Sequence, residues 1–191
     1  MKVLVIFSHP DPKSFNAALK EQFVKGLKDG KNQVKIIDLH KEKFNPVMKA
    51  NELHMKTVKD KKIRKYQKLI TWADALVFIH PIWWYNTPAI LKGFFDRTFT
   101  SGFAFKYEGG IPKGLLEHKK ALLIATYDSP WVFVHFYFGD IYYKCMTKPL
   151  LNFCGIKDVK EHCYTSVSTA DEAKRKEWLK ETYELGFGFG K

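Results

Sequence analysis

Cysteine is scarce in this chain, and long apolar runs are missing. The 191 residues include only three cysteines, Cys145, Cys154 and Cys163, which form no close pair. Such a count argues against a disulfide framework, and a metal site would need cysteines and histidines at tighter spacing. No apolar run approaches the roughly 20 residues that span a bilayer, and the one at the amino terminus is too short for a signal peptide. We therefore expect a cytoplasmic protein with no metal and no membrane insertion.

Acidic residues are in the minority. The chain carries 32 Lys and Arg against 20 Asp and Glu, a formal net charge of +12. This excess is typical of a lysine-rich solvated surface, and it also attracts phosphate-bearing cofactors or nucleic acid. The densest basic cluster, residues 59–65, has no interleaved aromatics or glycines, and the chain contains no nucleic-acid motif. We expect no nucleic-acid partner.

The composition is otherwise that of a globular protein. Apolar residues make up 46% and aromatic residues 16% of the chain, enough for a full-sized core. No second domain, internal repeat or low-complexity segment is visible, so residues 1–191 are expected to form one domain. The glycine-rich tail, residues 186–190, follows a helical pattern and is interpreted as a frayed end, not as a phosphate loop.

Strand-like runs alternate with helical patterns along the chain. Apolar or mixed runs predict strands over 2–7, 34–39, 75–79, 121–125 and 159–167. Between and after them, apolar residues at helical spacing predict helices over 15–29, 63–73, 88–94, 141–153 and about 172–185. Capping of three of these helices is predicted from Ser14, Thr87 and Thr169. Residues 40–59 are interpreted as a polar connection and 100–116 as an excursion loop, while 131–138 is ambiguous.

This alternation predicts an α/β fold. Strands joined through helices imply right-handed parallel crossovers and a doubly wound sheet with helices on both faces. The runs 2–7, 75–79 and 121–125 are apolar, as expected of central strands, whereas 34–39 and 159–167 carry polar residues, as expected of edges. A sheet of five parallel strands in the order 2-1-3-4-5 satisfies both conditions.

An aromatic cluster follows the third strand. Trp83, Trp84 and Tyr85 come just after it, and a helix begins at Thr87-Pro88. Ligands bind at the carboxyl ends of strands in open parallel sheets, and large flat side chains favour a partner over water. The cluster therefore predicts a planar aromatic ligand. The alternative is that a tryptophan here anchors the core.

The turn after the first strand has the composition of an anion site. A helix start capped by Ser14 would leave backbone N–H groups that bind phosphate. Lys13 adds a positive charge, and His9 and Asn16 add hydrogen-bond donors. Plain capping by Ser14 and Asn16 and a turn role for His9 are the alternatives. The location at the predicted switch point between the first and third strands favours phosphate binding.

Three stretches together make the chain similar to the flavodoxin-like NAD(P)H:quinone oxidoreductases, specifically their short bacterial members. They are Ser8-His-Pro…Ser14-Phe-Asn16, then Gln67…Ala73-Asp74 leading into residues 81–97, and Thr126-Tyr-Asp-Ser-Pro-Trp131. The second stretch is long and highly specific, and the resemblance covers nearly the whole chain. It implies a flavodoxin-like doubly wound sheet whose three loops hold a flavin.

The resemblance also implies roles for individual residues. Around the flavin phosphate it places His9, Lys13, Ser14, Phe15 and Asn16. Along the isoalloxazine ring it places Pro81, Ile82, Trp83, Trp84 and Tyr85, partly through backbone groups. At the pyrimidine end of the ring it places Thr126, Tyr127, Asp128 and Ser129. Candidate walls of the substrate pocket are Phe103, Tyr107, Tyr127 and Trp131.

Two features depart from the family's pattern. The third loop is glycine-rich in the best-known members, whereas here it has Asp128 and Ser129, and a carboxylate near the ring would disfavour a reduced flavin anion. A Tyr/His pair that stabilises charge on the flavin in some members is replaced by Val134 and Asp140. No catalytic pair is therefore transferred. The nearby candidates, with packing as the alternative role, are His135 and Tyr137.

The function implied by the resemblance is flavin-dependent NAD(P)H:quinone oxidoreduction. Hydride would pass from NAD(P)H to the flavin and then to a quinone or similar acceptor, in ping-pong turnover at one site. The cofactor is FMN or FAD, with FMN preferred because the carboxyl terminus is short. The sequence does not decide between NADH and NADPH. A homodimer is expected, and the aromatic segment 131–138 suits its interface, with an intramolecular core segment as the alternative.

Other functions share this resemblance. A flavin-binding accessory subunit that regulates a membrane transporter would keep the fold and offer the basic helix over 61–68 to its partner. An azo or nitro reductase would use the same aromatic pocket. A one-electron flavodoxin carrier is disfavoured, because such carriers are usually acidic.

Overall fold

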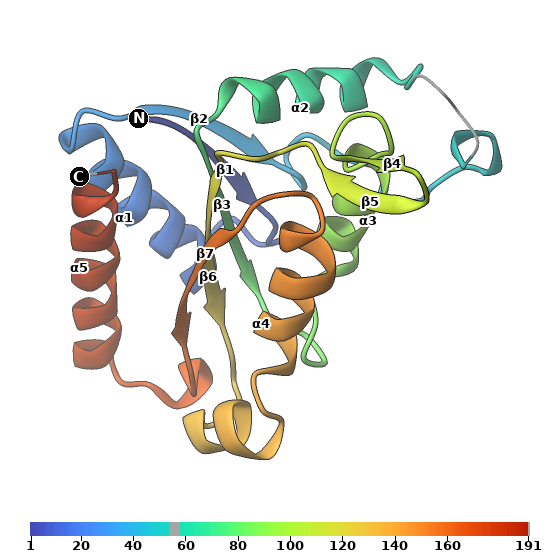
Figure 1. Cartoon of the computed structure of the whole chain (residues 1–191). Coiled ribbons are helices and arrows are strands. Elements are labelled where there is room, and N and C mark those ends of the chain that lie inside the picture. Colours follow the sequence, from blue (N-terminus) through green and yellow to red (C-terminus); the bar gives the residue numbers. More distant parts are fainter. Residues whose placement is uncertain (54–57, 191) are drawn as a thin grey trace.

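A sheet of five parallel strands forms the centre of the computed structural model, which describes residues 1–53 and 58–190. The order across the sheet is β2-β1-β3-β6-β7, which is 2-1-3-4-5 when only its own strands are counted (Figure 1). The predicted doubly wound, flavodoxin-like topology is confirmed. The strand bounds are β1 Lys2–Phe7, β2 Gln33–Asp38, β3 Ala75–Pro81, β6 Lys120–Thr126 and β7 Asp158–Tyr164. Residues 54–57 of the predicted polar connection lie outside the described residues.

The burial of each strand follows its sequence pattern. The three middle strands are covered on both faces, and Val5, Val77 and Leu122 lie side by side in register across them. In the edge strands β2 and β7 most residues are exposed or partly buried, and only Ile37 and Tyr164 of these two strands are buried. Because water reaches one side of an edge strand, the lysines and acids of the second and fifth predicted strands are accommodated there.

Helices cover both faces of the sheet. Helices α1 (Phe15–Asp29) and α5 (Glu172–Gly188) lie against each other on one face, and α2 (Lys61–Trp72), α3 (Ala89–Thr98) and α4 (Ile141–Met146) lie on the other (Figure 1). Each layer encloses its own buried cluster. The prediction of a frayed tail from Gly186 is wrong for most of its length, because α5 continues to Gly188. A Cβ at Gly186 would lie 2.3 Å from the Phe23 carbonyl oxygen, so glycine is needed for the close helix contact.

The segment predicted as a loop over 100–116 contains a hairpin. Strands β4 (Phe105–Glu108) and β5 (Ile111–Gly114) pair antiparallel. Gly109 and Gly110 join them, both with positive φ, as a two-residue hairpin turn requires. The glycines that suggested an irregular loop are therefore the turn of a regular element.

Two other predicted elements change shape. The helix predicted over 141–153 begins as α4 and continues as a π-helical turn, η3 (Thr147–Asn152), which contains Pro149. The ambiguous segment before it forms another π-helical turn, η2 (Phe133–Tyr137). The fifth strand ends at Tyr164 instead of residue 167, because Ser166 adopts a left-handed conformation and a 3-10 turn follows, η4 (Val167–Thr169).

Side-chain capping is confirmed at one of the three predicted helix starts. The Ser14 Oγ accepts a hydrogen bond from the Ala17 N–H. The cap of α3 is Pro88 and not Thr87, and that of α5 is Asp171 and not Thr169. Both differences move the helix start by one or two residues. A further 3-10 turn, η1 (Ala50–Glu52), precedes α2.

None of the helices in residues 1–53 and 58–190 has the length and apolar character needed to cross a bilayer.

Candidate flavin site

Three loops meet where the middle strands end, at the lower edge of the sheet in Figure 1. The Ser8 N–H donates to the Ile79 carbonyl at 3.1 Å, which joins the first loop to β3. The Ile82 N–H donates to the Thr126 carbonyl at 2.8 Å, which joins the second loop to the third. The parallel register thus brings together three loops that are about 40 to 120 residues apart along the chain.

The start of α1 follows the first of these loops and has free backbone donors. The Ala17 and Ala18 N–H groups both donate to Ser14. Among the described residues, the Phe15 and Asn16 N–H groups have no hydrogen-bond partner. They belong to the orphan donors of a helix start, where the helix dipole favours an anion.

Buried polar atoms without partners line the same place. Within the described residues, Ser8 Oγ, Asn16 Oδ1 and Thr87 Oγ1 are buried and make no hydrogen bond. The other end of the Asn16 amide is fixed, because its Nδ2 donates to Thr126 Oγ1 at 2.8 Å. A buried polar atom without a partner is costly unless a ligand satisfies it. The three atoms and the free N–H groups therefore fit the phosphate and ribityl chain of a flavin.

The remaining residues of the first loop differ in which of their groups are free to contact a ligand. The His9 Nδ1 accepts a hydrogen bond from the Asp11 N–H at 3.0 Å, and the His9 ring lies edge-on to Trp83 with centroids 6.3 Å apart. Lys13 is exposed, and its backbone N–H donates to Asp11. The Phe15 ring packs against Tyr164 and Trp178 under α5, so Phe15 can offer only its backbone to a ligand.

The aromatic loop is a tight turn in an unusual conformation. Trp83 and Asn86 exchange backbone hydrogen bonds of 3.1 and 3.0 Å across Trp84 and Tyr85. Trp84 and Tyr85 have φ values of 53° and 55°, a region normally occupied by Gly, Asn or Asp in such turns. Holding two bulky aromatics there costs on the order of 1–3 kcal/mol each, and such strain concentrates at ligand sites. The Trp84 side chain is 98% exposed as a result.

We expect Trp84→Ala to weaken flavin binding without unfolding the protein. Loss of one ring contact should raise the flavin Kd on the order of 10-fold, as expected for about 1 kcal/mol of stacking. Because the side chain is almost fully exposed, the free energy of unfolding should change by no more than about 0.5 kcal/mol. Fluorescence titration with FMN and FAD measures the first quantity and urea unfolding the second. Val47→Ala, also at an exposed apolar residue, is the control, and an unchanged Kd for Trp84→Ala would contradict this role.

The third loop differs from the sequence-based expectation in what the Asp128 carboxylate contacts. The Asp128 Oδ1 accepts a hydrogen bond from the Ser168 N–H at 3.0 Å, so this carboxylate is engaged with η4. The Ser129 Oγ accepts a hydrogen bond from the Tyr85 hydroxyl at 2.9 Å, which ties the aromatic turn to the third loop. Tyr127 is buried between the rings of Tyr85 and Tyr142. The Asp128 contact accounts for a carboxylate where the family has glycine.

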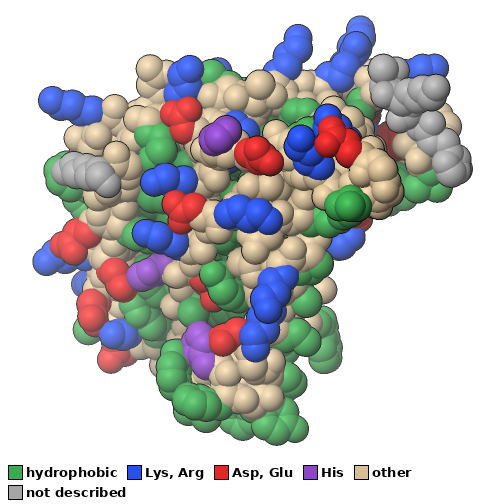
Figure 2. Space-filling view, viewed as in Figure 1, with side chains coloured by type: hydrophobic (Ala, Val, Ile, Leu, Met, Phe, Trp, Pro, Cys, Tyr) green, Lys and Arg blue, Asp and Glu red, His purple; other side chains and the backbone are tan. Residues whose placement is uncertain are grey.

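An exposed aromatic surface adjoins these loops. Figure 2 shows hydrophobic side chains gathered at the lower end of the molecule, where η2 lies in Figure 1. The exposed members are Trp131, Val132, Phe133, Phe136, Tyr137 and Phe138. We call this set the aromatic cap. The Trp131 ring contacts the His135 ring at 4.7 Å, and the His135 Nδ1 is bonded to Asp140. Val134, at the position of the family's tyrosine, is buried.

Two predicted pocket residues lie elsewhere. Phe103 precedes the β4–β5 hairpin and packs on the buried cluster beneath α3, and Tyr107 is exposed on β4. The hairpin occupies the upper right of Figure 1, whereas the end of β6, which Tyr127 follows, and the segment of the aromatic cap are at the lower end. One copy of the chain therefore does not bring all four predicted pocket residues together.

Sequence reasoning missed a buried support beneath the aromatic loop. His80, the residue before Pro81, is completely buried. Its Nδ1 donates to the Pro81 carbonyl at 3.0 Å, which leaves Nε2 to accept from the Tyr142 hydroxyl at 2.8 Å. Burial lowers the pKa of His80 to about 4, so the ring stays neutral, as these two bonds require. The only sequence signal is a histidine at the end of an apolar run, which also fits an exposed loop residue.

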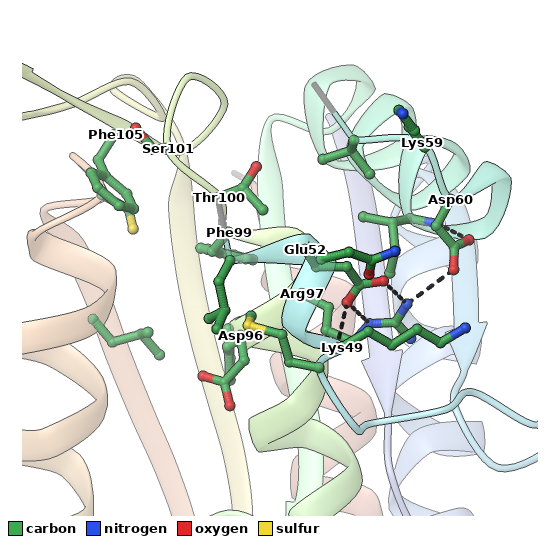
Figure 3. A pocket seen from close by; sticks show the side chains of 18 of the residues that line it. Lys49, Glu52, Lys59, Asp60, Asp96, Arg97, Phe99, Thr100, Ser101 and Phe105 are labelled. Carbon is green, nitrogen blue, oxygen red and sulfur yellow. Dashed lines mark hydrogen bonds and ion pairs between the residues drawn. The ribbon is translucent and has the colours of Figure 1, made fainter. Parts of the chain in front are cut away.

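A cavity lies away from this edge of the sheet. A space of about 720 Å³ lies between α2, α3, the hairpin and η3, with an apolar lining that includes Phe99 and Phe105 (Figure 3). At its side the Arg97 guanidinium is held by Glu52 at 2.6 and 2.9 Å and by Asp60 at 3.0 Å. Its remaining nitrogen donates to the Asn45 carbonyl at 2.6 Å. Because each nitrogen of the Arg97 guanidinium already donates within the protein and its charge is paired with Glu52 and Asp60, Arg97 supports the loop before α2.

A metal centre is not apparent. In the ranges 1–53 and 58–190, no group of three or more His, Cys, Asp or Glu side chains converges as metal ligands would. The three cysteines are free.

Comparison with known proteins agrees with this geometry. The sequence pattern of proteins with the flavodoxin-like fold matches residues 1–185. The chain is 31% identical to an uncharacterized NAD(P)H oxidoreductase of Haemophilus influenzae, over 92% of this chain and 89% of that one. It is also 31% identical to human ribosyldihydronicotinamide dehydrogenase (quinone), over 92% of this chain and 86% of that one. The chain therefore belongs to the flavodoxin-like NAD(P)H:quinone oxidoreductases, a family of flavoprotein enzymes.

Solved structures are similar over the full length. A protein of Streptococcus mutans superposes with a TM-score of 0.89 at 37% identity, covering 98% of this chain and 99% of that one. The NAD(P)H:quinone oxidoreductase of Methanothermobacter marburgensis superposes with a TM-score of 0.85 at 25% identity, covering 100% and 96%.

Proposed function

We propose that this protein is a flavin-dependent NAD(P)H:quinone oxidoreductase of the cytoplasm, and that residues 1–191 act as one flavin-binding domain. The observation that carries the proposal is the set of unpartnered polar atoms at the three loops. Ser8 Oγ, Asn16 Oδ1 and Thr87 Oγ1 lack hydrogen bonds among the described residues, next to the free N–H groups of α1 and a strained aromatic turn. A flavin nucleotide would satisfy both features. Its phosphorylated chain would bind the polar atoms and N–H groups, and its flat ring would stack on the aromatic turn.

Different residues of the three loops would hold different parts of the cofactor. The start of α1 and the Ser14 hydroxyl would bind the phosphate, and Lys13 would add charge attraction. The aromatic turn, braced by Ser129 and by the His80–Pro81 bond, would support the ring. Tyr127 and Trp131 would wall the space in front of it. FMN fits this set without further contacts, and we propose FMN as the cofactor in preference to FAD.

A bound flavin supplies the hydride-transfer chemistry that no side chain in this site can supply. The chain's own part is to bind, orient and exclude water. A single aromatic space beside the ring would admit the nicotinamide and the quinone in turn, which predicts ping-pong turnover. The net charge of +12 favours anionic NAD(P)H over neutral competitors at the encounter stage.

We further propose that the protein is a homodimer. The hairpin exposes Tyr107 and Ile111, at 61% and 71%, and the aromatic cap exposes six apolar residues within the segment 131–138. Surfaces of this kind are costly in a monomer. If the hairpin of a second copy reached the aromatic cap, it would bring Phe103 and Tyr107 to the pocket predicted for them. Sedimentation equilibrium tests this, and a monomer at micromolar concentration would contradict it.

The test of the activity is direct. The purified protein should be yellow, and mass analysis of the released cofactor should give FMN. It should oxidise NADH or NADPH with a quinone as acceptor, with the parallel lines of ping-pong kinetics in double-reciprocal plots. Flavin binding with negligible turnover would favour an accessory subunit of a transporter instead. Protein that stays colourless after reconstitution with FMN and FAD would refute the proposal.

A further inference from the structure

A hydrogen bond joins the aromatic turn to the third loop and leaves a hydroxyl donor free. The Tyr85 hydroxyl donates to the Ser129 Oγ at 2.9 Å, between residues 44 positions apart in the chain. A serine hydroxyl that accepts a hydrogen bond still has its own hydrogen to donate. Within residues 1–53 and 58–190, the Ser129 hydroxyl donates to no other group. A side-chain donor is therefore available at the place where the two loops meet.

The Tyr85 phenol that orients this hydroxyl is held from several sides. Its ring packs against the Phe138 ring, with centroids 4.1 Å apart, and against the Tyr127 ring at 6.4 Å. Its backbone belongs to a turn that two backbone hydrogen bonds close. Because ring and backbone are both fixed, the phenol hydroxyl occupies one place before any ligand binds. The Ser129 hydroxyl, to which it donates, is oriented in advance as well.

The third loop is fixed from the opposite side, by the segment that follows β7. The Ser129 carbonyl accepts a hydrogen bond from the Ser166 N–H at 3.2 Å. The preceding carboxylate, that of Asp128, accepts one from the Ser168 N–H of η4. Neighbouring side chains of the loop therefore have different partners, because Asp128 is engaged with η4 and Ser129 with the aromatic turn. The loop thus offers the turn a hydroxyl and not a carboxylate.

The third loop is also joined to the other two loops of the site. The Thr126 carbonyl accepts a hydrogen bond from the Ile82 N–H at 2.8 Å, and the Thr126 Oγ1 accepts one from the Asn16 Nδ2 at 2.8 Å. These bonds hold the start of α1, where the phosphate would bind, beside the aromatic turn, where the ring would lie. A ring on that turn would have the Ser129 hydroxyl at its edge, a placement that rests on the proposed function.

Flavin reduction creates a charge that a donor at this edge would stabilise. Hydride transfer from NAD(P)H brings two electrons and one proton, so a neutral ring gains one negative charge. A preorganised hydrogen-bond donor stabilises this charge more than it stabilises the neutral ring. At the two positions of the family's Tyr/His pair, Val134 is buried and apolar, and Asp140 is a carboxylate bonded to His135. Neither side chain supplies a donor to the ring.

We propose that Ser129, oriented by Tyr85, is the hydrogen-bond donor that stabilises the negative charge which hydride transfer places on the pyrimidine end of the flavin. The O–H bond of Ser129 stays intact, because its hydrogen is shared and not transferred. The hydroxyl favours binding of the reduced ring over the oxidised ring, and by linkage it raises the reduction potential of the bound flavin. Ser129 touches the cofactor, whereas Tyr85 is a positioning residue that acts through Ser129.

Ser129→Ala tests the donor in the flavin-loaded protein. The affinity for reduced FMN should fall on the order of 10-fold, the size expected for a hydrogen bond to a charged group, while that for oxidised FMN stays within about twofold. For a two-electron couple, a change of about 10-fold in the ratio of the two affinities lowers the reduction potential by about 30 mV. Anaerobic equilibration with a redox dye measures the potential, and fluorescence titration measures the affinity for oxidised FMN.

Two other variants serve as controls for this measurement. Ser129→Thr keeps a hydroxyl at the position, so the affinity ratio should stay within about twofold of wild type. Ser101→Ala removes an exposed hydroxyl before the β4–β5 hairpin and should change neither the potential nor the affinity. A fall in potential as large in Ser129→Thr as in Ser129→Ala would show that packing, and not the hydroxyl, sets the potential, which would overturn the proposal.

Tyr85→Phe tests the positioning role. It keeps the ring that packs on Phe138 but removes the hydroxyl, so the Ser129 hydroxyl is free to turn to other acceptors. The affinity ratio should fall about threefold in the wild-type background and should not change further in Ser129→Ala, because effects of residues that act as one unit do not add. An equal fall in both backgrounds would contradict a role of Tyr85 through Ser129.

The outcomes separate the role of Ser129 from the proposed function. A Ser129→Ala protein that binds FMN with the wild-type potential would overturn this role and leave the oxidoreductase function intact. If Ser129→Ala does not fold, an unchanged potential in Tyr85→Phe would overturn the role instead. Wild-type protein that binds no flavin would refute the function and the role of Ser129 together.

Discussion

Ser14→Asp is expected to abolish tight flavin binding while leaving the fold intact. Aspartate caps a helix about as well as serine, and this chain already uses Asp60 and Asp171 as caps of α2 and α5. The new carboxylate would stand where we expect a phosphate dianion, about 4 Å from it. At an effective dielectric constant of about 20 that repulsion is worth a few kcal/mol, so the Kd for FMN should rise on the order of 100-fold or more. Fluorescence titration with FMN measures it.

The control for this prediction is Ser14→Asn, which keeps a cap without the charge. Its Kd should stay within about tenfold of wild type. Both variants should match the wild type in thermal unfolding without flavin. Riboflavin, which has no phosphate, should bind Ser14→Asp as well as it binds the wild type. An equal loss for riboflavin and FMN would show that the start of α1 does not hold the phosphate.

The second large effect is expected at Arg97. Its side chain is only 4% exposed and carries four hydrogen bonds to Glu52, Asp60 and Asn45 (Figure 3). Arg97→Met would leave Glu52 as a partly buried carboxylate without its partner. Breaking such a pair from one side costs about 3–5 kcal/mol, and we expect about 3 kcal/mol here because Asp60 is partly solvated. Urea unfolding of the protein without flavin measures the loss.

Two further variants separate the effect of the Arg97 charge from that of its planar guanidinium. Arg97→Lys keeps the charge but loses the planar fork, and it should lose less stability than the methionine variant. Adding Glu52→Gln to Arg97→Met should restore part of the loss, because no unpaired carboxylate remains. A loss below about 1 kcal/mol for Arg97→Met would show that Glu52 and Asp60 are solvated enough to do without the arginine.

The fold was predictable because its signals are local. The run over 75–79 is apolar at every position, and an element of that pattern is stable only when both faces are covered. Ser14 could be recognised as a cap because capping depends on the residue itself and on the three that follow. The hairpin after α3 was missed, because Gly109 and Gly110 are equally common in irregular loops and in tight turns.

The support of the site was beyond sequence reasoning. His80 and Tyr142 are 62 residues apart, and their hydrogen bond depends on how α4 lies across β3. Glu161 lies in an edge strand and is only partly buried, yet its Oε1 is removed from water, which depends on how the rest of the fold packs against β7. From the sequence, the Asp128 carboxylate was expected near the flavin ring. The structure shows that it accepts a hydrogen bond from the Ser168 N–H of η4, a contact between residues 40 positions apart.

Residue order alone determined which segments form the strands and where the first helix begins, since backbone sterics and hydrophobic periodicity act over a few residues. Together with the handedness of parallel crossovers, it also determined that three particular loops share one edge. Tertiary structure decided which polar atoms at that edge lack partners, how the aromatic turn is strained, and which acid becomes buried. These properties depend on distances between segments far apart in the chain, and burial sets the energy of a charge only once the fold has placed the surrounding atoms.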